Sequence, residues 1–495
     1  MTVTGLLGFV LCLYTAAMFL IGWRCQGRIQ NAEDFTVAGR RLPLALAWAT
    51  LLATWFGAGT LLTQADEVRN EGLSVAALDP WGAGVCLLVA GLFFAKPLWE
   101  MKLLTLPDFF RRRFGAAAEL LAALIMVPSY FGWIAVQFVA LGTVLNALFG
   151  IDLNLAIFLV AMVGMGYTLQ GGMWSVTLTD ALQMVFILIG LVILGVTTLA
   201  RLGHGDYAFG MARLLAESDP QMLRAIPTET FSAFSAWLGV FCIGALGNIP
   251  GQDLTQRIFA ARSSQVARNA CLIAGVLYIL FGSIPLLLGL ASRILLPDAD
   301  QSVIMALGQS VLQPHPWAFV MFVLALVSAV LSTIDSAILA PASVLGENVL
   351  PRLFPARPGS GAGPGEGQDG YSLGLVRWSV IGITAASLAL AYLGESAYEL
   401  LESAYSMTFV GLFVPLTMGL YQKPRGQAPA IVSMATGTGL WLAHFLAEAS
   451  FDFDGGFLGS GLSVPLLSAL CGLVSYLATH AWIGKRPTAG FDPQG

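Results

Sequence analysis

The stretch LLATWFGAGT, residues 51–60, lies within an apolar run from Pro43 to Gln64 that is long enough to cross a membrane. Two glycines and the bulky Trp55–Phe56 pair interrupt this run, although glycine is a poor helix former. In hydrocarbon an unpaired backbone N–H or C=O costs several kcal/mol, so a broken helix persists there only where it lines a buried cavity. The stretch therefore predicts a transmembrane helix that breaks beside a binding site.

The composition places the whole chain in a membrane. It is 57% hydrophobic and 11% charged over 495 residues, against about 25% charged residues in an average soluble protein. The six cysteines are scattered without a CxxC pair, and the four histidines form no HExxH motif. These features predict an all-α polytopic membrane protein and argue against a disulfide framework or a zinc site.

Thirteen apolar windows approach the roughly 20 residues that a bilayer requires. They are residues 3–23, 43–64, 76–99, 117–149, 152–172, 176–201, 230–250, 266–296, 317–347, 372–394, 402–421, 427–447 and 461–483. No basic residue precedes the first window and Arg24 follows it, so we expect a retained first span rather than a cleaved signal peptide.

When successive loops are assigned alternately to the two sides of the membrane, most of the basic residues fall on one side. Of the 24 Lys and Arg residues, nineteen fall on one side, Arg257 among them, and five fall on the other. Positive residues mark the cytoplasmic side, so we expect the N-terminus outside and the C-terminus in the cytoplasm of a cell with this protein in its plasma membrane. The glycine-rich segment 351–371 lacks a GK[ST] motif and is predicted to be a flexible cytoplasmic linker.

A second predicted span is also interrupted. Residues 244–257 read GALGNIPGQDLTQR, where Pro250 removes a backbone donor and two glycines loosen the turn. The first break lies in span two and the second in span seven, five spans later. Because five is odd, the two five-span units run in opposite directions, and matched interruptions in inverted halves are typical of secondary transporters.

Polar side chains cluster in the ninth span, LALVSAVLSTIDSAILAPAS. Ser332, Asp335 and Ser336 share one helix face, with Thr333 at its edge. A carboxylate in a membrane helix indicates function, and hydroxyl and carbonyl oxygens suit sodium, although Ser and Thr also hold membrane helices together.

Three further aspartates accompany the predicted cavity. Asp180 lies in the sixth span, where it either serves the site or snorkels to the interface. Asp79, at the outer end of span three, is either a ligand or a solvated residue at a helix start, and Asp253 follows the second break.

Four ordered motifs give a resemblance to a known family. They are DFTVAGRRLPL at 34–44, YTLQGGMWSVTLTDALQ at 167–183, QDLTQRIFAARSSQVAR at 252–268 and LSTIDSAILAPASVLGENVL at 331–350. In these motifs the chain resembles the sodium:solute symporter family. The segments ATWFGAG, GLFFAKP and LGNIPGQDLTQR are similar, within that family, to the high-affinity choline transporters.

The resemblance implies a LeuT-type core of two inverted five-helix repeats, spans 2–6 and 7–11. It divides one transporter domain into a first span and cytoplasmic loop, a first repeat, an inverted second repeat and a peripheral C-terminal pair of spans. These parts are residues 1–42, 43–201, 230–421 and 422–495.

The resemblance also implies two sets of sodium ligands. The carbonyls of Ala53, Phe56 and Ala329 and the hydroxyls of Ser332 and Thr333 would hold one sodium ion. Some relatives hold a second sodium ion, which would fall at Asp180, Ser332, Asp335 and Ser336.

The resemblance to choline transporters is incomplete at the solute site. Those proteins surround a trimethylammonium group with aromatic rings, and Trp55 and Trp133 fall on two of the ring positions. Gly251 and Ala83 fall on two others, so half of the cage is missing. Asp79 and Asp253 stand near the gaps, and we expect the substrate-binding set to be Trp55, Trp133, Asp79, Gly251 and Asp253.

The sequence therefore predicts sodium-coupled uptake of a small organic solute, choline-like or otherwise bearing an amine, with sodium as coupling ion and no organic cofactor. Neutral or anionic solutes of the proline, pantothenate, sugar or carboxylate type remain alternatives. A transporter-like sensor is disfavoured because no kinase-like extension is present. An intramembrane protease is disfavoured because the GHGD motif at 203–206 falls in a loop, so no enzyme is expected. The partners expected are the solute and the lipid bilayer, not nucleic acid.

Overall fold

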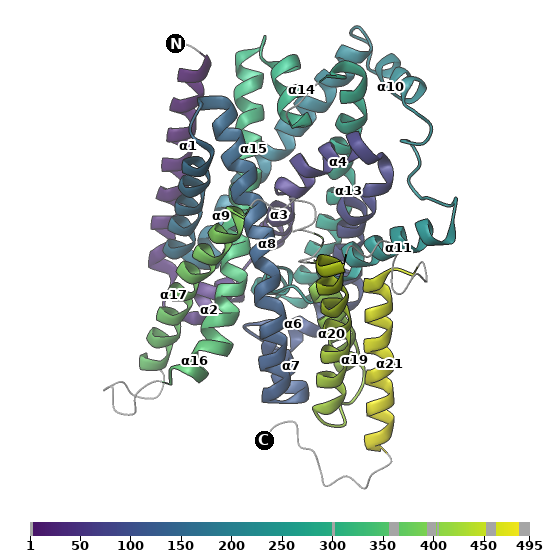
Figure 1. The fold of residues 1–495 in the computed structure, drawn as a ribbon. Coiled ribbons are helices and arrows are strands. Elements are labelled where there is room, and N and C mark those ends of the chain that lie inside the picture. Colours follow the sequence, from purple (N-terminus) through teal and green to yellow (C-terminus); the bar gives the residue numbers. More distant parts are fainter. Residues whose placement is uncertain are drawn as a thin grey trace.

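The computed structural model describes residues 3–298, 302–355, 366–393, 402, 405–451 and 462–484. Within these residues the regular elements are all helical, and β-pairing is limited to an isolated bridge between Leu42 and Ala261 (Figure 1). The predicted all-α fold is therefore confirmed.

The longer elements are α1 (Val3–Cys25), α2 (Ala32–Val37), α3 (Leu44–Trp55), α4 (Gln64–Glu71), α5 (Ala83–Val89), α6 (Ala95–Glu100), α7 (Leu106–Phe114), α8 (Ala116–Phe149), α9 (Leu153–Leu202), α10 (Tyr207–Glu217), α11 (Phe231–Leu246), α12 (Gln252–Ala260), α13 (Ser264–Leu295), α14 (Val303–Leu312), α15 (Pro316–Val344), α16 (Leu350–Leu353), α17 (Glu366–Ala391), α19 (Val414–Tyr421), α20 (Ala428–Phe451) and α21 (Val464–Gly484). Short 3-10 or π-helical turns join them: η1 (Gln26–Arg28), η2 (Ala38–Arg40), η3 (Gly59–Thr63), η4 (Leu73–Ala77), η5 (Leu78–Gly82), η6 (Ala90–Phe94), η7 (Leu345–Val349) and η8 (Phe409–Phe413).

The described residues contain nine helices that are long and apolar enough to cross a membrane, or ten if the bent pair α3 and η3–α4 counts as one span. Three shorter apolar helices accompany them, at Phe231–Leu246, Val303–Leu312 and Tyr405–Tyr421. The chain is thus a multi-pass membrane protein, and the exact number of thirteen spans stays a prediction.

Helix α9 covers two predicted spans in one element of 50 residues that is broken at Gly172 (φ 50°, ψ −150°). A Cβ at Gly164, before the break, would touch Ile334 of α15. Asp180, after the break, lies beside Arg257, which bonds Ser336 of α15. Both halves of α9 therefore pass the same level of α15, so the chain reverses direction at Gly172.

The first predicted break is present at the end of α3. Helix α3 stops at Trp55 with a last hydrogen bond from the Phe56 N–H to the Leu52 carbonyl, 2.9 Å, and the chain resumes in η3 at an angle of 59°. The Ala58 N–H, freed by the break, donates to the side chain of Gln137 on α8 at 2.9 Å. A neighbouring helix thus satisfies the backbone at this depth, as hydrocarbon requires.

The second predicted break separates α11 from α12. Residues 247–251 form a turn in which the Gly251 N–H donates to the Asn248 carbonyl at 2.9 Å. The hydroxyl of Thr408 donates to the Gly247 carbonyl at 2.6 Å, so the segment that leads into α19 supports this turn. Both interrupted helices are therefore confirmed, and at each break a neighbouring segment bonds a free backbone group.

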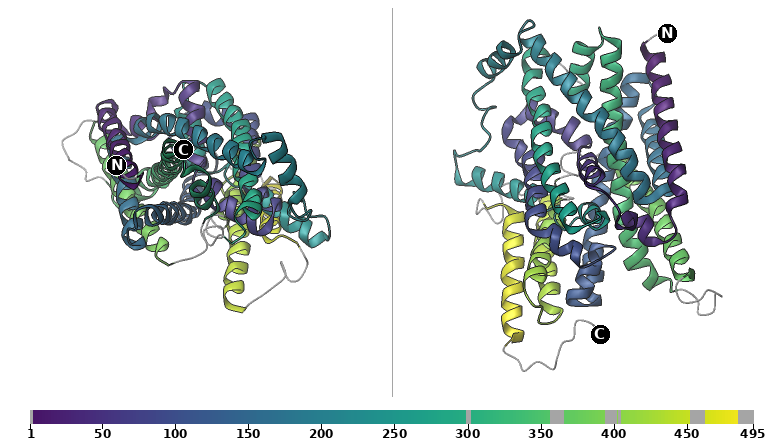
Figure 2. Two further views of the ribbon diagram at one scale, coloured as in Figure 1. Left: turned by 90° about the horizontal axis from the view of Figure 1, so that it is seen from above. Right: turned by 180° about the vertical axis from the view of Figure 1, so that it is seen from behind.

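The breaks lie in the interior of the bundle. Helix α15, whose residues are almost all buried, packs along α9, α8 and α3. Helix α1 lies at one side of the bundle and α21 at the other, as the front and rear views both show (Figures 1 and 2). The first and last helices therefore flank a core formed by α3, α8, α9, α12, α13 and α15.

We predict that Gly172→Ala destabilises the protein, because its backbone conformation is nearly inaccessible to residues with a side chain and a Cβ there would lie 2.5 Å from the Phe35 carbonyl oxygen. The expected cost is on the order of 1–3 kcal/mol, which lowers the melting temperature measured by size-exclusion chromatography after heating in detergent. Gly382→Ala, in α17, is the control, because a Cβ there meets nothing within 4 Å. Equal melting of the two variants would contradict this explanation of the reversal.

Candidate functional site

Buried oxygen atoms converge where α3 ends against α15. The Ser332 hydroxyl lies 3.0 Å from the Ala53 carbonyl oxygen and 2.9 Å from that of Ala329. The Thr333 hydroxyl lies 3.0 Å from the Thr54 carbonyl oxygen and 3.0 Å from that of Ala329. All five residues are buried. Three carbonyls and two hydroxyls thus form a cluster without formal charge, which we call the α3–α15 oxygen cluster.

Local structure explains why these oxygens are available. Ala53 and Thr54 lie in the last turn of α3, where carbonyls have no partner within the helix. Ser332 and Thr333 turn their hydroxyls back to the carbonyl of Ala329, one turn earlier on α15, as such residues often do in helices. Oxygen ligands of this kind suit a hard cation.

Four of the five residues expected at one sodium ion are brought together in this cluster. The exception is Phe56, whose N–H makes the last bond of α3 and whose carbonyl is not among the bonded oxygens. The carbonyl of Thr54, which the resemblance did not imply, contacts Thr333 instead. Gly57 nevertheless runs close by, because a Cβ there would lie 2.6 Å from the Thr333 hydroxyl oxygen.

A second buried polar cluster lies beside the first. The Thr50 hydroxyl donates to the Asp180 carboxylate at 2.5 Å, and the guanidinium of Arg257 lies 3.8 Å from the same oxygen. The Arg257 Nη2 donates to the Ser336 hydroxyl at 2.5 Å, and Ser336 lies 3.2 Å from the Asp335 carboxylate. Asp180, Asp335 and Ser336, expected at a second sodium ion, thus share one cluster with a positive charge.

For this cluster one alternative is excluded and one expectation is wrong. Asp180 does not snorkel to the interface, because it is completely buried against Thr50 and Arg257. Arg257 does not lie in a cytoplasmic loop, because α12 continues to Ala260 and its own side chain is 1% exposed. The sequence signals failed because a short helix after a break is hard to distinguish from a loop.

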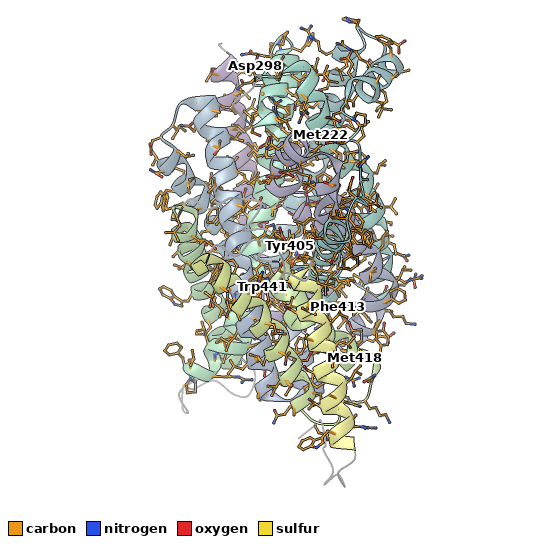
Figure 3. The ribbon with its side chains drawn as sticks, turned by 45° about the vertical axis from the view of Figure 1, so that its right-hand side comes forward. Met222, Asp298, Tyr405, Phe413, Met418 and Trp441 are labelled. Carbon is orange, nitrogen blue, oxygen red and sulfur yellow. The ribbon has the colours of Figure 1, made fainter. Side chains whose placement is uncertain are left out.

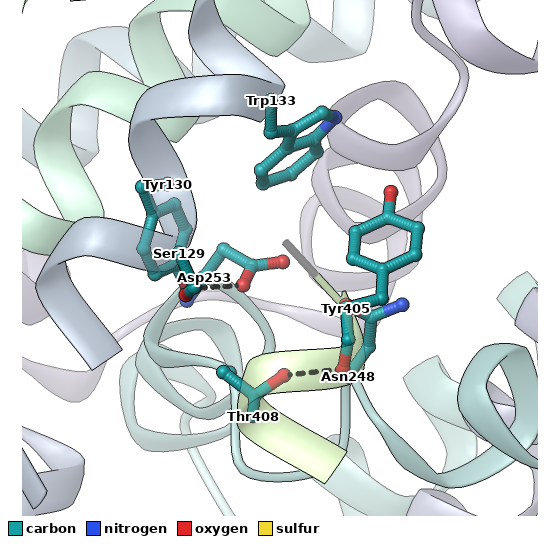
Figure 4. A pocket seen from close by; sticks show the side chains of 8 residues that line it. Ser129, Tyr130, Trp133, Asn248, Asp253, Tyr405 and Thr408 are labelled. Atoms are coloured by element: carbon teal, nitrogen blue, oxygen red, sulfur yellow. Dashed lines mark hydrogen bonds between the residues drawn. The ribbon is translucent and has the colours of Figure 1, made fainter. Parts of the chain in front are cut away.

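A small cavity of about 10 Å³, room for about one water molecule, lies between α8, the second break and the helix Tyr405–Tyr421 (Figure 4). Its lining consists of Ser129, Tyr130, Trp133, Asn248, Gly251, Asp253, Tyr405 and Thr408. The ring centroids of Trp133 and Tyr405 are 6.3 Å apart, and those of Tyr130 and Trp133 are 5.9 Å apart. Tyr405 lies near mid-height of the bundle (Figure 3). Three rings and one carboxyl group thus line the cavity.

Asp253 is held in position by two donors from other helices. The Trp55 indole N–H donates to one carboxylate oxygen at 2.7 Å, and the Tyr130 hydroxyl donates to the other at 2.6 Å. The residue also lies in the first turn of α12, where the helix dipole favours a negative charge. Four of the five predicted residues therefore line the cavity or hold its carboxylate: Trp133, Gly251 and Asp253 line it, and Trp55 orients Asp253.

Asp79, in contrast, lies outside the cavity lining. Its carboxylate accepts hydrogen bonds from the Thr60 hydroxyl at 2.7 Å and from the Tyr278 hydroxyl at 2.9 Å. It is 4% exposed, so it is not a solvated helix-start residue either. Ala83 is buried and also lies outside the lining, whereas Gly251 belongs to it.

Tyr130 and Tyr405 are parts of the site that were not predicted from the sequence. A signal existed for Tyr130, because it precedes Trp133 by three residues and so shares its helix face. Tyr405 is separated from Trp133 by 272 positions, and only the fold brings their rings together.

Comparisons with known proteins agree with this architecture. The profile of the "Sodium:solute symporter family" matches residues 35–437. High affinity choline transporter 1 of Homo sapiens is 27% identical over 427 residues, which cover 82% of this chain and 70% of that protein. High-affinity proline transporter PutP of Bacillus subtilis is 24% identical over 495 residues, which cover 95% of this chain and 99% of that protein.

A solved structure of a Na+-coupled sialic acid symporter, in a substrate-bound outward-open state, has the same fold. It is 18% identical, with a TM-score of 0.78, and the match covers 99% of this chain and 99% of that chain. At this identity the likeness shows the fold alone, and that fold is the LeuT-type architecture expected from the sequence.

We predict that replacing Ser332 and Thr333 together by alanine raises the sodium concentration needed for half-maximal thermal stabilisation of the purified protein by about tenfold or more. The physical reason is the loss of two of the five oxygens in the α3–α15 oxygen cluster, and a tenfold change corresponds to only about 1.4 kcal/mol.

Thr384→Ala is the matched control for this double variant, because its buried hydroxyl also bonds one carbonyl a turn earlier, at 2.8 Å, but lies on α17. An unchanged sodium dependence in the double variant would show that sodium binds elsewhere.

Proposed function

Because this chain belongs to the sodium:solute symporter family, we propose that the solute it takes up with sodium is a small compound bearing a positively charged amine. The family and the relatives are transporters, and sodium is the coupling ion of this family. The class of solute, the residues that bind it and the direction of transport are the proposal.

One observation carries the solute class: the carboxylate of Asp253 lies in a buried cavity beside the rings of Trp133 and Tyr405. An ammonium group over an aromatic face gains up to about 2 kcal/mol when it is desolvated. A hydrogen bond between an ammonium N–H and a carboxylate is about twice as strong as a neutral one. Rings and carboxylate together therefore favour a cation that has both an apolar surface and N–H donors.

Gly251 supports the choice of an amine with N–H groups over a trimethylammonium group. A Cβ at this position would lie 2.7 Å from a carboxylate oxygen of Asp253. A ring at position 251, as the choline-type cage requires, would therefore displace the carboxylate. In this chain a carboxylate replaces a ring, and a carboxylate binds more strongly to a solute that can donate hydrogen bonds.

The α3–α15 oxygen cluster is the proposed sodium site. One sodium ion that enters down about 100 mV gains about 2.3 kcal/mol, and a tenfold inward sodium gradient adds about 1.4 kcal/mol. One ion could thus sustain a several-hundredfold accumulation of solute. Because the cluster joins the break of α3 to α15, sodium would stabilise the arrangement of helices around the cavity during alternating access.

We also propose an orientation for the chain in the plasma membrane, with the N-terminus outside and the C-terminus in the cytoplasm. The excess of basic residues on one set of loops supports it, and the buried Arg257 does not change this excess. The two proposed inverted halves are residues 43–201 and 230–421, with 1–42 before them and 422–495 as a peripheral addition.

A neutral or zwitterionic solute is the second candidate. Both carboxylate oxygens of Asp253 already accept a hydrogen bond, from Trp55 and from Tyr130, so the group is satisfied without a cation. The similarity to a bacterial proline transporter points the same way. A carboxylate that serves only to orient Trp55 and Tyr130 would leave the rings to bind an apolar solute.

We predict that Asp253→Asn weakens binding of an amine by about 10- to 100-fold, because a hydrogen bond to a charged group contributes about 1.5–3 kcal/mol. Binding is measured from melting shifts of the purified protein in sodium, with choline, betaine, a primary amine, proline and a carboxylate as ligands. Asp79→Asn is the matched control, because Asp79 is equally buried but bonds Thr60 and Tyr278 outside the cavity.

The primary amine should stabilise the wild-type protein most, and Asp79→Asn should retain that binding. If only the carboxylate or proline shifts melting, the proposed cationic solute is wrong and the family assignment alone stands.

A further inference from the structure

Arg257 stands apart from the other basic residues of the chain. Among the residues that the structure describes, it is the one Lys or Arg that is buried, with its side chain 1% exposed. It projects from α12 into the region where α3, α9 and α15 meet. Its Nε donates to the Thr50 hydroxyl at 3.2 Å, and its Nη1 donates to the Asp253 carbonyl at 2.9 Å. A charge this deep in a membrane protein is costly and marks a functional position.

The guanidinium lies among the residues that the family resemblance implies for a second sodium ion. Its Nη2 is 2.5 Å from the Ser336 hydroxyl oxygen and 3.8 Å from a carboxylate oxygen of Asp180. These are two of the four residues of that set. The other serine of the set, Ser332, is engaged with Ala53 and Ala329 in the α3–α15 oxygen cluster.

The Ser336 hydroxyl is already surrounded by polar groups. A hydroxyl has one proton and two lone pairs, hence three directions. The Ser336 oxygen has three polar neighbours: Arg257 Nη2 at 2.5 Å, the Thr54 hydroxyl at 3.1 Å and the Asp335 carboxylate at 3.2 Å. The closest of them is the guanidinium, so a sodium ion bound to Ser336 would lie directly beside a positive charge.

We infer that Arg257 is a built-in cation that replaces the second sodium ion, so that this chain binds a single sodium ion, at the α3–α15 oxygen cluster. The inference rests on the proposed sodium site. Two positive charges repel each other strongly where water is excluded, so the guanidinium and a sodium ion do not share Ser336. The number of sodium ions bound is thereby set by one side chain, Arg257.

The position of Arg257 on α12 links this role to the solute cavity. Arg257 lies one helical turn after Asp253, whose carboxylate lines the cavity and whose carbonyl accepts a bond from the guanidinium. A movement of α12 when solute binds would move both charges together. A second sodium ion, in contrast, would have to bind and leave independently.

The rival outcome has a structural basis as well. The Asp180 Oδ1 and the Asp335 Oδ2 are buried and have no hydrogen-bond partner among the described residues. Two carboxylates and one guanidinium leave an excess negative charge, which could attract a sodium ion beside Arg257. The number of sodium ions that the wild-type protein binds decides between the two.

The test is equilibrium binding of radioactive sodium to the purified full-length protein in detergent, which requires no knowledge of the solute. We expect one saturable sodium ion per chain in the wild type and in Arg257→Lys, which keeps the positive charge. Arg257→Gln, which removes the charge, should bind two. Arg113→Gln is the matched control with one ion, because Arg113 also donates to carbonyls but lies away from Asp180.

Two sodium ions per wild-type chain would overturn the inference and leave the proposed function intact, whereas no saturable sodium binding would overturn the proposed sodium site itself. If Arg257→Gln does not fold, Ser336→Ala decides in its place. A count that stays at one in Ser336→Ala agrees with the inference, and a count that falls from two to one contradicts it.

Discussion

The structure depends on the carbonyl groups that α3 leaves unbonded when it stops in the middle of the membrane. In hydrocarbon these groups need partners within the protein, and the hydroxyls of Ser332 and Thr333 on α15 provide them. The same atoms form an oxygen cluster suited to a hard cation. A helix break that would otherwise destabilise the fold thus becomes the proposed coupling site, and α15 has polar side chains at this level although most of its residues are apolar.

The second break likewise positions charged side chains. Gly251 leaves room for the Asp253 carboxylate, Trp55 and Tyr130 orient it, and Arg257 follows one turn later on the same short helix. Helix α12 therefore presents the Asp253 carboxylate to the proposed solute cavity and the Arg257 guanidinium to the cluster of Asp180 and Ser336. Because α12 also contacts α3 and α15, a movement of this helix would change the packing at both breaks.

Much of this arrangement follows from sequence patterns, and the exceptions have physical reasons. Glycine, proline and isolated hydroxyls within apolar runs are local signals, so both breaks and the polar face of α15 were predictable. The contact between Trp133 and Tyr405, the carbonyl of Thr54 and the burial of Arg257 depend on packing between distant segments. Asp79 was wrongly placed at the solute site because the sequence does not indicate which neighbour a buried carboxylate bonds. In the structure that neighbour is Tyr278.

The most direct test of the account is uptake of a labelled primary amine into proteoliposomes that contain the purified protein. Equal inward gradients of sodium or of potassium are imposed at the same membrane potential. Sodium coupling predicts accumulation of the amine above its external concentration with sodium alone, and loss of that accumulation when a sodium ionophore dissipates the gradient. Uptake that is equal in sodium and potassium, or that fails for the amine but proceeds for a carboxylate, would contradict it.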